Sequence, residues 1–289
     1  MPDPEELRID ANGITFGALS WGAQDAPLAL LIHGYPDTAW TWRHLGPYLA
    51  ERGWRAVAPF TRGYSPTSPA PSDRYRIADL ADDVLALHAA LGGDDRAALI
   101  GHDWGAITTW AASTKAPDRF ARYVGMSVPP PVALLKAWTS PRTLGVAARQ
   151  LRMSWYLVFN QLPIAERAQS RVIPRLWRDW SPGYDATEDV RRTLAALQHP
   201  EHLRAAVRYY RNNLQGGIKA LFTTKPGAPV LYLHGERDGC IQAALPQLYP
   251  ELFVTGSRIE VLPGAGHFLQ LEQPDVVNAL IAGWLQRAD

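Results

Sequence analysis

The stretch that decides the fold is residues 97–105, which read Ala97-Ala98-Leu99-Ile100-Gly101-His102-Asp103-Trp104-Gly105. The apolar first half predicts a short buried strand, and helical spacing follows as far as Lys115. The two glycines permit a sharp turn that would project Asp103 into a pocket. A strand–turn–helix of this kind is the setting of a catalytic nucleophile, usually a serine. A helix N-terminus stabilises a carboxylate as the anion, although Asp103 alone is equally compatible with a plain helix N-cap.

Strand-like and helix-like segments alternate on both sides of this stretch. Helical spacing covers Trp40–Arg52, Ile77–Leu91 and Asp275–Arg287. The expected strands are Leu7–Asp10 and Ile14–Trp21, joined as a hairpin by Asn12-Gly13, then Leu28–Ile32, Trp54–Pro59, Ala97–Ile100, Arg122–Met126, Val230–Leu233 and Arg258–Val261. This alternation predicts an α/β fold with a mainly parallel sheet and helices on both faces.

The alternation is interrupted after Ser127. Pro129-Pro130-Pro131 breaks the chain, and about ninety residues follow in which we find helical spacing and no convincing strand. We expect residues 1–128 and 226–289 to form the core, and residues 129–225 to form a helical cap over the carboxyl ends of the strands, where such sheets bind ligands. The cap segment carries 15 Lys+Arg against 6 Asp+Glu, and the rest of the chain 14 against 22. This difference in charge is best explained by solvent-exposed faces that each segment carries separately. The alternative is that the basic segment docks as a lid on an acidic body.

Two later loops supply partners for Asp103. Asp238 follows the expected strand at Val230–Leu233, and His267 follows the next strand, so both lie at strand carboxyl ends. The order nucleophile, acid, histidine is the one this kind of fold requires. Glu236 is a competing acid, but Asp238 is the better candidate. The sequence therefore predicts a catalytic triad of Asp103, Asp238 and His267.

A fourth element is His33-Gly34-Tyr35-Pro36, directly after an apolar strand. By analogy, the Tyr35 backbone N–H and the N–H of Trp104 would form an oxyanion hole. The Tyr35-Pro36 bond is a candidate cis peptide. We expect His33, Pro36 and Trp104 along the substrate pocket. The imidazoles of His33, His102 and His234 are better explained as buried groups that hold their loops than as catalytic bases.

Together these elements resemble the epoxide hydrolases of the α/β-hydrolase fold, and less closely the haloalkane dehalogenases. The resemblance spans nearly the whole chain, includes Arg62-Gly63-Tyr64-Ser65 and is weakest in the helical insertion. It implies an eight-stranded, mostly parallel sheet, an Asp nucleophile that forms an ester with the substrate, and a vicinal diol as product. It implies no cofactor and no metal.

The same resemblance implies two cap tyrosines over the nucleophile. In that family, one tyrosine is followed by Gln five positions later and by Pro two positions after the Gln. Tyr156, Gln161 and Pro163 match this spacing. An aromatic-Tyr-Arg-Asn run is matched at Tyr209–Asn212 and selects Tyr210. Adjacent helical side chains point about 100° apart, so Tyr209 and Tyr210 cannot both face the pocket. Ordinary packing within the cap is the alternative for each tyrosine.

Three other functions remain open at this point. A haloalkane dehalogenase shares the triad and would use the Trp104 indole, with Trp155 or Trp177 as a second halide donor. A fluoroacetate-type dehalogenase is less favoured, because Trp104 stands where that family carries an arginine. A non-catalytic ligand-binding member of the fold is also open, although such a protein has no need of all three triad residues.

The bulk composition excludes several classes of partner. The 289 residues have a formal net charge of +1, so no global field points to nucleic acid or membrane. The single cysteine, Cys240, rules out an intrachain disulfide and a cluster of thiolates around a metal. The first residues are acidic and lack an apolar signal segment. We expect a cytoplasmic monomer or homodimer acting on a small epoxide and water, and the predominance of Arg over Lys hints at a bacterial source.

Overall fold

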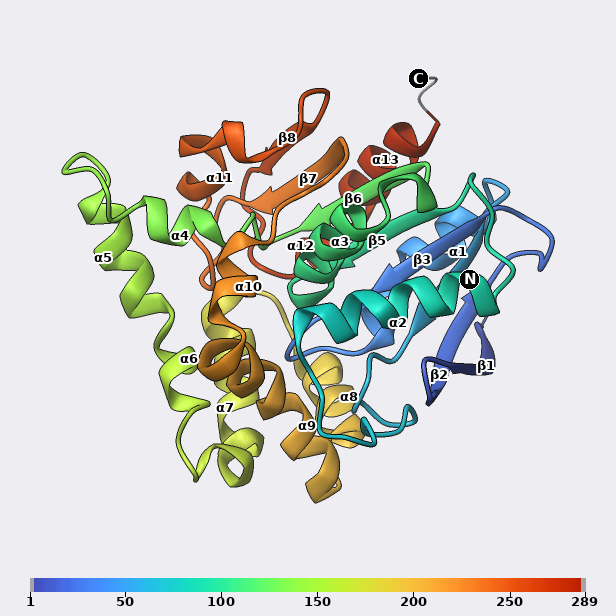
Figure 1. Ribbon diagram of the computed structural model, residues 1–289, viewed down its shortest axis with the longest axis horizontal. Coiled ribbons are helices and arrows are strands. Elements are labelled where there is room, and N and C mark those ends of the chain that lie inside the picture. Colours follow the sequence, from blue (N-terminus) through green and yellow to red (C-terminus); the bar gives the residue numbers. More distant parts are fainter. Residues whose placement is uncertain (1–2, 287–289) are drawn as a thin grey trace.

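The computed structural model describes residues 3–286 and is built on one eight-stranded sheet, shown in Figure 1. The strand order is β1-β2-β4-β3-β5-β6-β7-β8. The strands are β1 (Glu5–Ala11), β2 (Ile14–Trp21), β3 (Leu28–Ile32), β4 (Arg55–Pro59), β5 (Ala98–His102), β6 (Arg122–Met126), β7 (Val230–Gly235) and β8 (Arg258–Leu262). All eight expected strands are present, with bounds within two residues of the prediction.

The sheet is mostly parallel, as predicted. Only β1–β2 and β2–β4 pair antiparallel, while the pairs from β4–β3 to β7–β8 run parallel. The β1–β2 hairpin turns at Asn12 and Gly13, whose φ angles of 49° and 72° suit the two central positions of a type I′ turn. Strands β3 and β5 at the centre are buried along their whole length. Their continuous apolar runs follow from helices covering both faces.

Two helices pack on each face of the sheet (Figure 1). On one face α2 (Ile77–Ala90) contacts α3 (Trp104–Lys115), and on the other α1 (Leu45–Ala50) contacts α13 (Pro274–Leu285). The expected single helix over Trp40–Arg52 is wrong, because a short 3₁₀ turn at Ala39–Trp42 is followed by α1. Pro47 explains the interruption, since it has no N–H to bond to the carbonyl four residues earlier.

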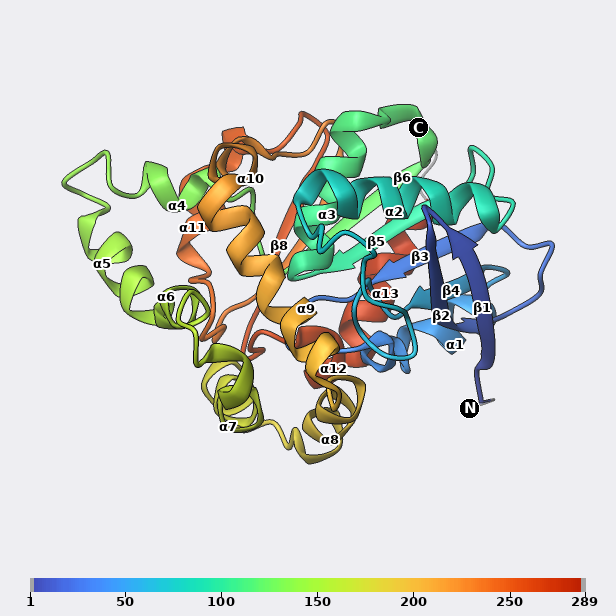
Figure 2. The same cartoon turned by 60° about the horizontal axis from the view of Figure 1, so that its bottom comes forward.

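Between β6 and β7 the described chain contains helices and no strand. These are α4 (Val132–Lys136), α5 (Leu144–Met153), α6 (Trp155–Phe159), α7 (Ala165–Trp180), α8 (Thr187–Ala196), α9 (Pro200–Arg211), a π-helical turn at Asn212–Gly216 and α10 (Ile218–Thr223). Figure 2 shows that they form a layer beside the sheet rather than on one of its faces. Trp177 on α7 and Thr193 on α8 bond to the loop after β3, so this layer lies at the carboxyl ends of the strands.

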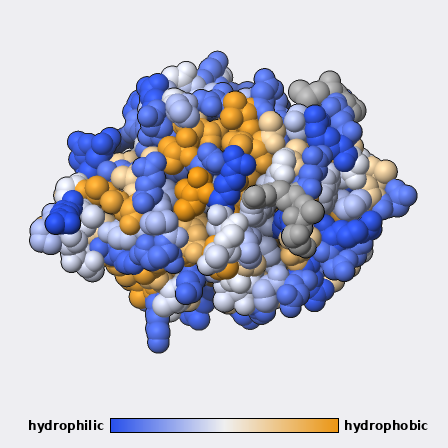
Figure 3. All heavy atoms as spheres, turned by 90° about the horizontal axis from the view of Figure 1, so that it is seen from above, coloured by the Kyte–Doolittle hydropathy of each residue, from blue (hydrophilic) through white to orange (hydrophobic). Residues whose placement is uncertain are grey.

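Exposed apolar side chains gather in this helical layer. Of ten large apolar residues that are exposed in the described chain, eight lie between Leu135 and Ile218. In Figure 3 an apolar area stands out at the centre of a mostly hydrophilic face. No helix among residues 3–286 is both long and apolar enough to cross a lipid bilayer.

Candidate active site

Asp103 stands in the strained turn between β5 and α3. Its φ of 54° and ψ of −116° are unusual for a residue with a side chain, and such strain is concentrated at functional sites. The turn fits because its neighbours are glycines. A Cβ on Gly105 would collide with the carbonyl of Ile32, and one on Gly34 would collide with the Asp103 carboxylate. Asp103 caps no backbone amide of its own helix, so the plain N-cap interpretation does not hold.

The two carboxylate oxygens of Asp103 face different groups. Oδ1 accepts a hydrogen bond of 2.8 Å from the Tyr35 backbone N–H. Oδ2 lies 3.7 Å from His267 Nε2, beyond hydrogen-bond range but close enough for a strong charge interaction. The side chain is buried, with 5% of the residue exposed. One oxygen is therefore held in place while the other faces the histidine.

Asp238 and His267 form the second half of the site. His267 Nδ1 lies 2.9 Å from Asp238 Oδ2, and Asp238 Oδ1 accepts the backbone N–H groups of Cys240 and Ile241 at 2.7 and 3.0 Å. The competing acid, Glu236, instead accepts the N–H of Gly264 in an exposed position. Asp238, the acid ranked above Glu236 from the sequence, is thus the carboxylate that reaches the imidazole.

One nitrogen of the His267 imidazole makes no hydrogen bond to the described residues. Nε2 is buried and has no hydrogen-bond partner in the described structure. Burial alone would lower the pKa of His267, but the negative charges of Asp238 and Asp103 outweigh it and raise the pKa to about 10. The imidazole of His267 is therefore protonated at neutral pH in the resting site.

The other three histidines near the site are structural. His33 accepts the Thr61 N–H at Nε2 and bonds the Gly34 carbonyl through Nδ1, so neither nitrogen is free for a substrate. His102 bonds the His267 carbonyl, and His234 lies between Tyr232 and the Ile241 carbonyl. Burial lowers the pKa of His33 to about 4 and that of His102 to about 3, so both are neutral. A pocket-lining role for the His33 ring stays a prediction.

The rings of Tyr156 on α6 and Tyr210 on α9 lie side by side, close enough to Asp103 for its charge to act on both phenols. Their ring centroids are 5.7 Å apart, and Tyr210 also packs edge-on against Tyr35 and Trp104. Burial is the main cause that raises the pKa of both phenols, and the Asp103 charge raises each further. Both phenols are therefore protonated at neutral pH.

Tyr209 faces away from this pair. Its hydroxyl donates to the Arg62 carbonyl at 2.9 Å, and its ring packs against Tyr64 and Tyr75. The end of α9 is fixed by Asn212 and Asn213, whose side-chain oxygens accept the backbone N–H groups of Tyr75 and Ile77. The asparagines of the Tyr-Tyr-Arg-Asn-Asn run therefore fix the end of α9 against the segment that precedes α2.

The Tyr35-Pro36 loop is tied to the helical layer. The peptide bond between the two residues is cis. The Pro36 carbonyl accepts the Trp177 indole N–H at 2.8 Å and the Thr193 hydroxyl at 3.1 Å. The Tyr35 hydroxyl donates to Gln169 at 2.5 Å. The loop that holds Asp103 Oδ1 is thus positioned by helices from another part of the chain.

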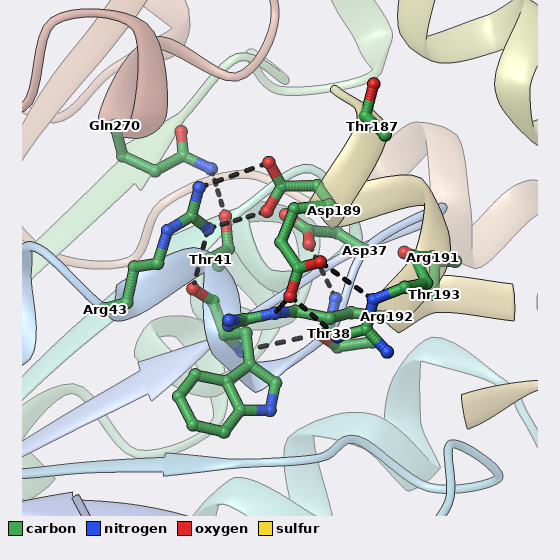
Figure 4. A network of polar contacts seen from close by, with 12 residues as sticks. Asp37, Thr38, Thr41, Arg43, Thr187, Asp189, Arg191, Arg192, Thr193 and Gln270 are labelled. Atoms are coloured by element: carbon green, nitrogen blue, oxygen red, sulfur yellow. Dashed lines mark hydrogen bonds and ion pairs between the residues drawn. The ribbon is translucent and has the colours of Figure 1, made fainter. Parts of the chain in front are cut away.

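A buried polar network continues from this loop, as Figure 4 shows. Arg43 binds Asp189 of α8 with its Nη1 2.6 Å from Oδ1, and Tyr184 donates to the same carboxylate at 2.8 Å. Asp37 is also buried there, and burial followed by the Asp189 charge raises its pKa to about 7. The network joins the segment after β3 to α8 of the helical layer.

Several residues of the site carry no local sequence signal. The Trp180 ring packs edge-on against His267 at 4.8 Å, and the Cys240 sulfur lies 3.3 Å from the Tyr156 hydroxyl. Gln169 reaches the site only through Tyr35. Cys240 is visible in the sequence as a lone cysteine two residues after Asp238, but its position beside Tyr156 is a tertiary contact between residues 84 positions apart.

This fold and this site define a class of protein. Residues 27–274 match the family model described as alpha/beta hydrolase fold. The match covers well over half of the chain, so the chain belongs to the α/β-hydrolase fold family.

Individual relatives refine this assignment. The chain is 28% identical to an AB hydrolase superfamily protein of Bacillus subtilis over 96% of both chains. It is also 28% identical to Epoxide hydrolase A of Mycobacterium tuberculosis, over 99% of this chain and 98% of that protein. Among solved structures, an epoxide hydrolase of Vigna radiata is 27% identical with a TM-score of 0.80, covering 98% of both chains. Epoxide Hydrolase A of Mycobacterium thermoresistibile is 28% identical with a TM-score of 0.75 over 99% of both.

Proposed function

We propose that this chain hydrolyses an epoxide to a vicinal diol through a covalent ester on Asp103. The observation that carries the proposal is the pair of phenols, Tyr156 and Tyr210, beside a carboxylate in a nucleophile turn. The names of the full-length relatives from Mycobacterium tuberculosis and Vigna radiata support the same activity. Residues 129–225 serve in this proposal as the cap that carries both phenols.

In the first step a carboxylate oxygen of Asp103 attacks an epoxide carbon. This carbon is saturated, so displacement by a carboxylate is the suitable chemistry, and the carbon–oxygen bond of the ring breaks as the ester bond forms. Negative charge develops on the departing oxygen. Tyr156 and Tyr210 donate hydrogen bonds to it, and one of them transfers its proton.

In the second step water attacks the carbonyl carbon of the ester. His267 Nε2 takes the water proton, and Asp238 stabilises the imidazolium that results. The oxyanion forms at the oxygen already held by the Tyr35 N–H, with the Trp104 N–H as the second proposed donor. Collapse of this intermediate releases the diol, and the imidazolium proton returns to the tyrosinate.

The charge on Asp103 gives the two steps different proton requirements. In the resting enzyme that charge helps to raise the pKa of His267 to about 10. Esterification removes that charge, so the pKa of His267 falls in the intermediate and its Nε2 proton leaves to solvent. The neutral imidazole is then available as a base for water. After the diol leaves and the Asp103 charge returns, His267 takes up a proton from solvent.

A pH profile of ester hydrolysis tests this coupling. Because only neutral His267 accepts the water proton, the rate constant should rise with pH to a plateau, with a midpoint below 10. Single-turnover quench-flow of the preformed ester measures it. A rate constant that falls as the pH rises would rule out His267 as the base.

Removal of the two phenols should abolish ring opening selectively. Each of Tyr156→Phe and Tyr210→Phe is expected to lower kcat/KM by about 10-fold to 100-fold, and the double variant by about 10⁴-fold, because the leaving oxygen loses its proton donors. Initial rates of diol release measure the effect.

Tyr209→Phe is the matched control on the same helix. Its hydroxyl contacts the Arg62 carbonyl and the Thr61 side chain, so kcat/KM should stay within about threefold of the parent while stability falls by about 1 kcal/mol. A fully active Tyr156/Tyr210 double variant would remove the basis for epoxide chemistry.

The indole N–H groups argue against a haloalkane dehalogenase. The Trp177 N–H is already donated to the Pro36 carbonyl, and the Trp155 ring lies under the Arg175 guanidinium at 4.6 Å. Neither is placed as the second halide donor that the alternative requires. Parallel assays of halide and diol release separate the two activities.

A further inference from the structure

The thiol of Cys240 lies inside the catalytic centre but takes part in none of the steps above. Cys240 is fully buried and is the single cysteine of the chain. Its backbone N–H holds Asp238, while its sulfur lies 3.3 Å from the Tyr156 hydroxyl. A nucleophilic atom is therefore placed between the triad and one of the proposed proton donors.

Three metal-binding atoms converge at this point. One ligand atom from each of Asp103, Cys240 and His267 lies within 4.8 Å of the other two. His267 Nε2 is the buried nitrogen without a partner, and it faces Asp103 Oδ2 at 3.7 Å. Ligands of a tetrahedral zinc ion stand roughly 3.3–3.8 Å apart. The nitrogen and oxygen already have this spacing, so only the sulfur has to approach.

We propose that Asp103, Cys240 and His267 form a binding site for a thiophilic divalent cation, Zn²⁺ or Cd²⁺, which blocks catalysis when it binds. A thiolate, an imidazole and a carboxylate are ligands that zinc favours, whereas magnesium and calcium prefer oxygen alone. The ion replaces the thiol proton and the proton on His267 Nε2, and both protons leave to solvent. Water fills the fourth position.

The surroundings of the three ligands favour such an ion. Asp238 bonds the other nitrogen of His267 at 2.9 Å, the carboxylate–histidine–metal arrangement that orients a ligand and increases its basicity. The Tyr156 hydroxyl is placed to donate to the thiolate. Cation binding rests on this geometry alone, while the block of turnover rests also on the proposed function, because the ion would occupy both the nucleophile and the base.

Ultraviolet absorption of the metal-free full-length protein during titration with Cd²⁺ tests the site. A thiolate-to-metal charge-transfer band should grow and saturate at one ion per chain. Since the chain has no other cysteine, such a band can come only from Cys240. Surface histidines that bind cadmium produce no such band. Absence of the band would overturn the proposal.

Cys240→Ser is the matched variant, because it keeps a small polar side chain beside Tyr156 and removes the sulfur. The variant should lose the band. Its Zn²⁺ concentration for half-inhibition should be at least about tenfold higher than that of the parent, with each protein's inhibition measured against its own metal-free activity. His267→Gln should weaken Cd²⁺ binding by a similar factor, measured by the band. Unchanged zinc sensitivity in Cys240→Ser would overturn the proposal.

The two proposals fail separately. A saturating band in a protein that does not open epoxides supports the cation site and refutes the proposed function. Epoxide turnover in a protein that shows no band refutes the cation site and leaves the proposed function standing.

Discussion

Asp103→Ala should lower kcat/KM for epoxide hydrolysis at least about 10⁴-fold, because no other group in the site can form the ester. Oδ1 of Asp103 is already held by the Tyr35 N–H, whereas Asp238, the other buried carboxylate near Tyr156, is bound to His267 and to two backbone N–H groups. Asp95→Ala, which removes an exposed carboxylate, is the matched control and should retain full activity. Initial rates and thermal unfolding measured together separate a lost nucleophile from a lost fold. Parental activity in a folded Asp103→Ala variant would contradict the proposal.

His267→Gln should separate the two chemical steps. The first step needs Asp103 and the phenols, whereas the second needs a base for water, and a glutamine amide does not serve as one. Turnover should fall about 10³-fold or more, while the ester accumulates. Intact-protein mass spectrometry should then find the enzyme heavier by one whole substrate molecule.

The double variant Asp103→Ala with His267→Gln is the control for that adduct. It removes the carboxylate and should gain no mass, whereas an adduct on Cys240 or a surface residue would persist in it. A His267→Gln enzyme that turns over normally without an adduct would contradict the two-step scheme.

Much of the fold follows from local patterns. The apolar runs at Leu28–Ile32 and Ala97–Ile100 predict strands β3 and β5 because buried parallel strands need apolar side chains on both faces. The helix that was expected over Trp40–Arg52 fails for an equally local reason, since Pro47 interrupts it. Bounds of strands and helices differ by a residue or two because hydrogen bonding, rather than composition, determines where an element ends.

The proximity of Asp103, Asp238 and His267 could be predicted because the fold fixes where strands end. Asp103, Asp238 and His267 follow β5, β7 and β8, and parallel strands bring their carboxyl ends to one edge. The two cap tyrosines came from resemblance, since nothing in local spacing tells which face of α9 turns inward. The asparagine bonds that fix the end of α9 span more than 130 residues, so they are visible only in the folded chain.

Contacts made at a distance account for what the sequence did not predict. The free Nε2 of His267 and the approach of the Cys240 sulfur both depend on loops after β7 and β8 packing beneath α6 and α7. The same is true of the bond from Tyr35 to Gln169, which joins residues 134 positions apart. Burial and partners of single polar atoms are tertiary properties, and they decide the chemistry of this site.

A single turnover in oxygen-18-labelled water, with enzyme in excess over epoxide, tests the central claim most directly. If water attacks the ester carbonyl, the first label enters the Asp103 carboxylate, and the peptide containing Asp103 becomes heavier while the diol carries no label. If the label appears in the diol and the Asp103 peptide keeps its mass, water attacks the epoxide itself and the covalent account is wrong.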